Sequence, residues 1–164
     1  MKRTIGLLSG VLMVGLGAAG CQVVAARVEP TPICDFNALM ATPPPAAPAP
    51  ALVPATPAAL TEMPLNSVNI TDVGITNKIM IQSASARRQP TGTVEVWTRL
   101  VNCTDFPLQI EGRTHFLDEG QAPVEDVSAW ARVYLSPRSY GVYKESSIDV
   151  ARVRYYYVEI REGR

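Results

Sequence analysis

The stretch TVEVWTRLV at residues 93–101 alternates between apolar and polar side chains, and LQIEGRTHF at residues 108–116 does the same. In the first stretch Val94 and Val96 face one way, and Glu95 faces the other. Such a period of two, sustained along a whole segment, is typical of an antiparallel strand with one face on a core and one toward solvent. The two stretches therefore predict neighbouring strands of a β-sheet.

Shorter alternating stretches lie on either side of this pair, at residues 67–73, 78–84, 129–135 and 153–161. Gly, Pro, Asn and Asp separate them, and no segment shows the strong 3.6-residue stripe of an amphipathic helix. We therefore predict an all-β fold, an immunoglobulin-like antiparallel β-sandwich at residues 65–164.

The last predicted strand, within RVRYYYVEIR at residues 152–161, carries the strongest interaction signal. Three alternate residues are predicted to face the core: Tyr156, Val158 and Ile160. Arg154, Tyr155 and Tyr157 then form a candidate partner-binding face, because Tyr and Arg are enriched at protein interfaces. The alternative is that the two tyrosines only cover the sheet, or that the strand is buried on both faces.

A proline-rich segment precedes the predicted strands. Nine of the fourteen prolines lie between residues 30 and 57, and residues 41–59 read ATPPPAAPAPALVPATPAA. Proline donates no backbone hydrogen bond, and so little apolar surface cannot offset the entropy of ordering the chain. We therefore predict that residues 21–64 hold a lipid anchor and a disordered, semi-rigid Pro/Ala-rich linker.

The anchor is inferred from the N-terminus. Residues 1–20 resemble a lipoprotein signal peptide, with two basic residues, a short apolar run and a small-residue cleavage site. Ala-Ala-Gly before Cys21 resembles a bacterial lipobox, which predicts lipidation of Cys21 and membrane anchoring through the acyl chains. The alternative is an ordinary signal peptide that happens to precede a cysteine. By resemblance to proteobacterial sorting signals, Gln22 rather than Asp after the cysteine implies the periplasmic face of the cell outer membrane.

Two further cysteines, Cys34 and Cys103, would then lie in an oxidising compartment. They either form a disulfide or remain as two thiols, and the sequence leaves both alternatives open because pairing depends on their separation in space. Whether this disulfide forms decides how far the linker, which acts as a tether, can hold the domain from the lipid. A fully extended segment over residues 22–64 spans on the order of 130 Å, whereas a disulfide leaves about 40 Å between lipid and domain.

Charge and motifs argue against several function classes. The chain has 15 basic and 15 acidic residues, so no electrostatic attraction to nucleic acid is expected. The single histidine, His115, is expected to be exposed to solvent and is a poor metal ligand by itself. Thiol-exchange, nucleophile-elbow and phosphate-loop motifs are absent from the sequence. We therefore predict no catalytic activity and no cofactor.

Residues 97–161 resemble the YcfL family of small proteobacterial lipoproteins. The resemblance rests on LVNCTDFPL at residues 100–108, in which Asn102-Cys103-Thr104 is expected to form an Asx corner. It continues in this order: Arg113, Phe116, Asp118-Glu119-Gly120, Trp130, Leu135 to Pro137, Arg154 and Arg161. The resemblance implies an immunoglobulin-like sandwich and an outer-membrane lipoprotein. The Pro/Ala linker, Cys103 and the acidic pair Glu125-Asp126 depart from the family pattern.

Together these observations predict a structural or adaptor lipoprotein. It would bind envelope proteins, or identical copies of itself, in an assembly such as a secretion or injection machine, through an edge strand of the sandwich. The alternative is a tethered regulator of peptidoglycan synthesis, which needs the long reach that a disulfide between Cys34 and Cys103 would remove.

Overall fold

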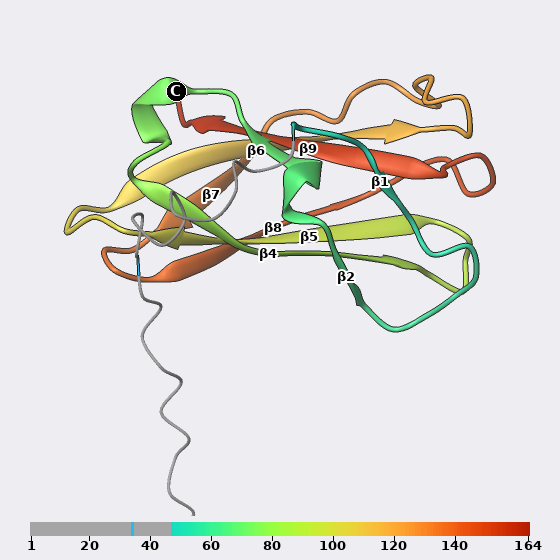
Figure 1. Ribbon diagram of the computed structural model, residues 1–164, viewed down its shortest axis with the longest axis horizontal. Coiled ribbons are helices and arrows are strands. Elements are labelled where there is room, and N and C mark those ends of the chain that lie inside the picture. The colour runs from blue at the N-terminus through green and yellow to red at the C-terminus, as the bar shows by residue number, and fades with distance from the viewer. Residues whose placement is uncertain (1–33, 35–46) are drawn as a thin grey trace, which may run out of the picture.

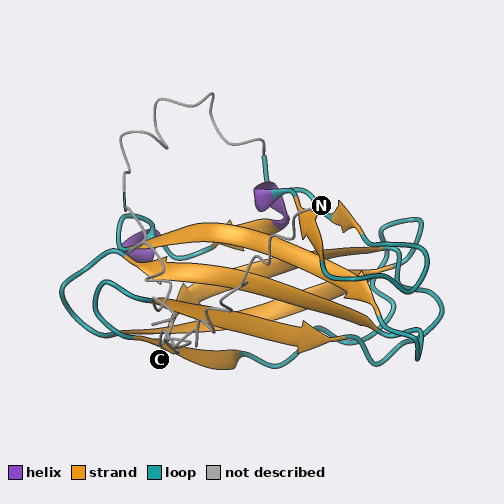
Figure 2. Cartoon of the chain, turned by 90° about the horizontal axis from the view of Figure 1, so that it is seen from below, coloured by secondary structure: helices purple, strands orange, loops and turns teal. Residues whose placement is uncertain are grey.

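The computed structural model describes residues 34 and 47–164. These residues form two packed β-sheets and two short 3-10 helices, with no α-helix among them (Figures 1 and 2). The strands are β1 (Ala51–Leu52), β2 (Thr61–Met63), β3 (Val68–Ile70), β4 (Ile79–Arg88), β5 (Val94–Asn102), β6 (Leu108–Leu117), β7 (Ala131–Leu135), β8 (Tyr140–Ser146) and β9 (Tyr155–Glu162). The 3-10 helices are η1 (Leu65–Ser67) and η2 (Val73–Ile75).

The order of the strands confirms the predicted all-β sandwich. The first sheet has the order β1-β9-β6-β7, with β3 also paired to β9, and the second has the order β2-β4-β5-β8. All named strand pairs are antiparallel except β3 and β9, which run parallel. The chain crosses between the sheets several times, so each sheet combines segments that are distant in sequence.

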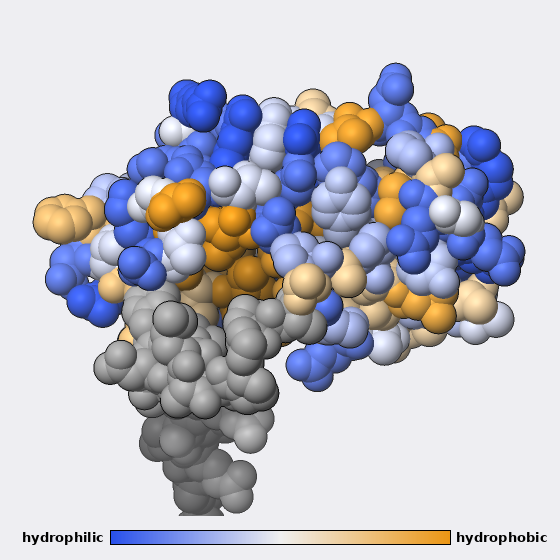
Figure 3. Space-filling view, turned by 45° about the horizontal axis from the view of Figure 1, so that its top comes forward, coloured by the Kyte–Doolittle hydropathy of each residue, from blue (hydrophilic) through white to orange (hydrophobic). Residues whose placement is uncertain are grey.

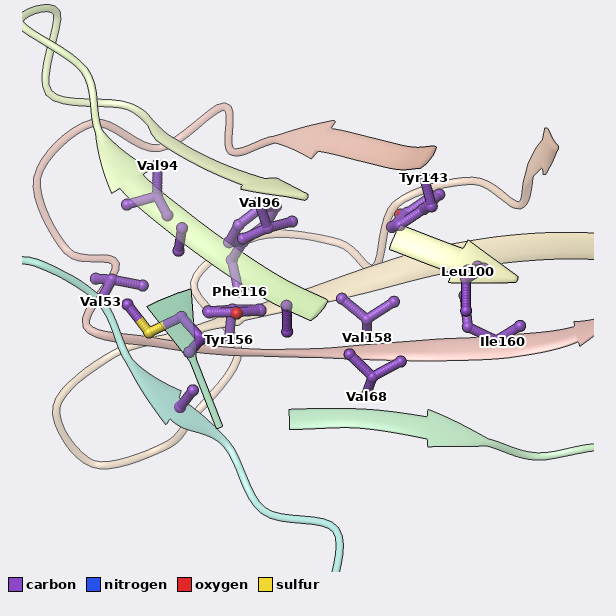
Figure 4. Close-up of a cluster of buried hydrophobic side chains, with 14 of the residues drawn as sticks. Val53, Val68, Val94, Val96, Leu100, Phe116, Tyr143, Tyr156, Val158 and Ile160 are labelled. Atoms are coloured by element: carbon purple, nitrogen blue, oxygen red, sulfur yellow. The ribbon is translucent and has the colours of Figure 1, made fainter. Parts of the chain in front are cut away.

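The core lies between the two sheets, and β9 contributes to it as predicted. Tyr156, Val158 and Ile160 are buried and face side chains of the second sheet, as Figure 4 shows. Tyr143 of β8 packs against Gly112 of β6, where an added Cβ would lie 2.6 Å from the ring. Burial of this apolar surface is the main force that holds the two sheets together.

The core also buries two tyrosine hydroxyl groups, and each has a hydrogen-bond partner. The Tyr143 hydroxyl lies 2.9 Å from Thr114 Oγ1, and burial raises the pKa of Tyr143 to about 12. The Tyr156 hydroxyl lies 3.5 Å from Ser67 Oγ. These contacts satisfy polar groups that would otherwise be costly to bury.

The predicted linker boundary at residue 65 is wrong, because the sandwich begins before it. Ala51 and Leu52 pair with β9, and Met63 pairs with β4. Ala51, Val53 and Met63 are buried in the core. The prolines at 48, 50, 54, 57 and 64 fall between or beside the short strands β1 and β2. The predicted signal peptide, Cys21 and the parts of the predicted linker at residues 22–33 and 35–46 lie outside the described residues.

Candidate protein-interaction surface

The outer face of the first sheet carries successive cross-strand pairs between β6 and β9. Strand register places Leu117 opposite Tyr155, His115 opposite Tyr157, Arg113 opposite Glu159 and Glu111 opposite Arg161. Residues directly opposite one another in antiparallel strands are close enough to interact. The two strands therefore bring apolar, aromatic and charged side chains together along one surface.

The middle of this face is organised around the Glu159 carboxylate. Arg113 donates a hydrogen bond to Glu159, and the His115 ring lies 3.1 Å from the same oxygen. The His115 ring also stacks on Tyr157, with the ring centroids 4.1 Å apart. Burial alone would raise the pKa of Glu159, but the bonds to His115 and Arg113 outweigh it and hold that pKa below its usual value.

The prediction that His115 is exposed to solvent is wrong. Only 13% of its side-chain surface is accessible. It does lie on the face opposite to Phe116, as the alternation indicated. The long side chains of Tyr157 and Glu159 cover it, and these contacts depend on strand register rather than on the local sequence.

A second buried carboxylate, Glu111, lies further along the same face. Arg161 donates two hydrogen bonds to it, at 2.9 and 2.8 Å, and Arg132 donates another at 3.1 Å. The bonds from Arg161 are the main reason that the pKa of Glu111 is lowered. Glu111 thus joins three strands of the sheet, β7, β6 and β9, through their side chains.

Trp130 contacts both the arginine that pairs with Glu159 and an arginine that pairs with Glu111. The guanidinium carbon of Arg113 lies 4.4 Å from the indole ring centroid, and that of Arg161 lies 3.9 Å from it. Cations at these distances from an aromatic face are attracted by the ring quadrupole. Because each arginine also pairs with a carboxylate, Trp130 helps to fix the side-chain conformations on this face.

The predicted partner-binding residues lie at one end of this face. Tyr155 and Tyr157 project outward and are half-buried, and Arg154, which precedes β9, is exposed. Leu52 of β1 pairs with Tyr155 in register and is 61% exposed. We call Leu52, Arg154, Tyr155 and Tyr157 the tyrosine surface. Sequence reasoning missed Leu52 because it lies within the segment that was assigned to the linker.

The backbone of β9 is not a free edge. β6 pairs with one side of it, and β1 and β3 pair with the other. A partner strand therefore cannot add to β9, so contact with the tyrosine surface has to use side chains. An edge-strand contact of the kind that the sequence suggested would have to use a strand other than β9.

Cys34 and Cys103 form a disulfide, with their Cα atoms 5.6 Å apart. Of the two alternatives left open by the sequence, the structure contains the bonded one. Cys103 directly follows β5, and its backbone N–H donates to the Lys78 carbonyl just before β4. The bond therefore fixes the N-terminal segment to the end of the domain where β4 begins and β5 finishes.

The outer face of the second sheet contains a shallow, open hollow of about 260 Å³. The hollow is lined by Leu60, Ser83, Ser85, Trp97, Arg99, Tyr140 and Val142. On the face that Figure 3 shows, polar side chains predominate, and apolar ones form smaller patches among them.

Two further features concern residues 34 and 47–164. His, Cys, Asp and Glu side chains do not gather there in groups of three or more that could hold a metal ion. The same residues contain no helix with the length and apolar character needed to cross a membrane.

Comparison with known proteins gives two solved structures of similar shape. The crystal structure of cj0090 from Campylobacter jejuni aligns with 59% of this chain and 98% of its own, at 13% identity and a TM-score of 0.49. A DUF1425 family member from Shewanella sp. pv-4 aligns with 70% of this chain and 96% of its own, at 16% identity and a TM-score of 0.46. No family model matches the sequence, and no curated protein matches it.

The lowered pKa of Glu159 predicts how the free energy of unfolding changes at acidic pH. Because the folded pKa of Glu159 lies below its unfolded value of about 4.3, its stabilising contribution is complete above that pH. It is lost as the pH falls through the folded pKa. Glu159→Gln cannot titrate, so its stability deficit relative to the wild type should shrink below about pH 4. Thermal unfolding midpoints between neutral and acidic pH would check this, and parallel profiles would contradict it.

Proposed function

We propose that this chain is a non-catalytic adaptor, anchored by a lipid on Cys21 to the periplasmic face of the outer membrane. It binds an envelope protein through the tyrosine surface. The observation that carries the proposal is that exposed Leu52 lies opposite half-buried Tyr155 in the strand register, with Tyr157 on the same face of β9 and exposed Arg154 next to Tyr155 in the chain. Aromatic and arginine side chains of this kind provide much of the binding energy at protein interfaces.

The rigidity of the surface supports this role. Tyr157 is held by its stack on His115, and Tyr155 lies between Leu52 and Leu117 in the strand register. Side chains that are already ordered lose little conformational entropy on binding. The tyrosine surface can therefore bind a partner without first reorganising.

The disulfide weighs against the alternative role as a regulator of peptidoglycan synthesis. With Cys34 bonded to Cys103, only residues 22–33 separate the proposed lipid from the domain. Such a segment reaches about 40 Å when fully extended. This short reach favours a partner close to the anchoring membrane, and the resemblance to the YcfL family favours the same location.

The proposal can be tested by capturing partners from lightly crosslinked envelopes with the tagged, full-length protein. Three variants are compared with the wild type: Tyr155→Ala/Tyr157→Ala, Arg154→Glu and Tyr140→Ala. Tyr140 provides the matched control because it lies on the outer face of the opposite sheet. Arg154→Glu changes an exposed side chain, so it tests the surface without removing packed rings.

We expect stoichiometric capture of an envelope protein by the wild type and by Tyr140→Ala. The two variants of the tyrosine surface should reduce that capture at least about tenfold, the effect of losing one interface hot spot. Equal capture by all variants would overturn the proposed interface. Circular dichroism of each purified variant verifies that it remains folded.

A further inference from the structure

The loop between β5 and β6 is held in one conformation by its own side chains. Asn102 Oδ1 accepts hydrogen bonds from the Thr104 N–H at 2.9 Å and the Thr104 hydroxyl at 2.8 Å. Asn102 Nδ2 donates to the carbonyls of Phe106, Leu135 and Ser136, at 2.7, 3.2 and 3.1 Å. The Asx corner expected from the sequence is therefore present, and the loop is rigid.

This rigid loop presents an apolar side chain to solvent. Phe106 is 72% exposed, although its carbonyl accepts a hydrogen bond from Asn102 Nδ2. A second apolar side chain, Val73 of η2, is 88% exposed. Figure 1 shows the β5–β6 loop and η2 at the end of the sandwich that also holds the C-terminus. We call this end, with Val73, Cys103 and Phe106, the tethered end.

The disulfide attaches the chain at this same end. Cys103 lies three residues before Phe106, and Cys34 is thirteen residues after Cys21. The segment between the two N-terminal cysteines spans about 40 Å at most, whereas the ten-residue strand β6 alone extends about 33 Å. Attachment here therefore holds the tethered end within about 40 Å of the lipid anchor in every orientation of the domain, whereas the opposite end can lie roughly 70 Å from it.

We propose that the tethered end rests on the phospholipid surface, with Phe106 inserted into the interfacial layer. This inference rests on the proposed lipidation of Cys21. Phenylalanine is among the apolar side chains that insert at the boundary of headgroups and acyl chains, and a loop that is already ordered loses little further conformational freedom on insertion. A short tether also gives an effective concentration in the millimolar range, so a contact that would be weak in solution is populated.

The charges beside Phe106 indicate that the contact is mainly apolar. Arg138 pairs with Asp105 at 2.8 Å, and Lys78 pairs with Glu162 at 3.7 Å. Because these cations already have carboxylate partners, the tethered end is not a basic patch that would bind through anionic headgroups alone. We therefore expect the contact to persist at about 0.5 M salt, where exposed charges are strongly screened.

The test uses the full-length lipidated protein in vesicles of phosphatidylethanolamine and phosphatidylglycerol that contain shallow-brominated acyl chains. Phe106→Trp places a fluorophore at the tethered end. Ile148→Trp is the matched control, because Ile148 is 87% exposed in the β8–β9 loop, at the opposite end of β8 from the Asn102–Ser139 contact. Both variants retain Trp97 and Trp130, so the wild-type signal is subtracted from each.

We expect the added emission to be quenched at least about threefold more strongly in F106W than in I148W, at both low and high salt. Adding Cys34→Ser to F106W should remove most of that difference, because the tether is then no longer fixed at Cys103. Equal quenching in F106W and I148W, in protein that floats with the vesicles, would overturn the inference while leaving the anchor intact. Failure to float would overturn the anchored function and this inference with it.

Discussion

Cys34→Ser is expected to lower the free energy of unfolding by about 4 kcal/mol. The disulfide joins residues that are 69 positions apart, so it removes a large amount of conformational freedom from the unfolded chain. In the chain-entropy model, a loop of this length corresponds to about 4 kcal/mol. The folded domain should persist, because Cys103 lies at the end of β5 rather than between the two sheets.

Urea unfolding with and without a thiol reductant provides the measurement. The reductant should shift the midpoint of the wild type to that of Cys34→Ser, and it should leave the variant unchanged. A wild-type midpoint that does not respond to the reductant, and equals that of the variant, would show that the bond contributes nothing to stability.

Arg88→Met is expected to have an effect of similar size. Arg88 is 6% exposed, and its guanidinium donates to the carbonyls of Pro54, Gly92 and Val153, at 3.1, 2.8 and 2.6 Å. One side chain thus joins three connections: β1 to β2, β4 to β5 and β8 to β9. Its loss removes three hydrogen bonds to a charged group, at about 1.5 kcal/mol each, and the total loss is about 4.5 kcal/mol.

The neighbouring substitution Arg87→Met provides the control. Arg87 projects to the outer face and pairs with Glu95, which Lys144 continues to pair after the substitution. We expect Arg87→Met to cost about 1.5 kcal/mol, because it removes one hydrogen bond to a buried carboxylate that keeps its Lys144 partner. Equal losses for both variants in urea unfolding would refute the special role of the carbonyl contacts.

The main strands could be predicted because their alternation is local. Residues 93–101 and 108–116 became β5 and β6 almost as predicted, and the odd and even positions of β9 face as expected. In each of these strands, at least three of the alternate positions on the core face hold large apolar side chains. Burial of that face therefore determines both the strand and its orientation.

The strands and strand ends that were not predicted lack a regular alternation of large apolar side chains. β4 extends to Arg88 beyond the predicted end at residue 84, because a register shift between Ile81 and Ser83 changes the parity of its core face. β8 was not predicted, because Gly141 and Tyr143 alternate on its core side and only one of them is large. β1 and β2 are too short for any period to appear, and long-range pairing creates them.

The candidate surface could be predicted only in part. The sequence indicated Arg154, Tyr155 and Tyr157 because they lie on one strand. Leu52 reaches the same surface from the far end of the domain sequence, and Trp130 reaches Arg161 through the pairing of β6, β7 and β9. Contacts of this kind depend on topology, which a single sequence does not reveal.

The position of β9 also determines the order in which the domain can fold. β1, β3 and β6 all pair with this C-terminal strand, and Ala51 of β1 is separated from its partner Tyr156 by about a hundred residues. Synthesis releases the chain from its N-terminus, so the early strands have to wait for the last ten residues. Contacts over such distances in sequence make folding slow. A chain that ends before Tyr155 would keep β6 and β7 as a hairpin but could not complete the first sheet.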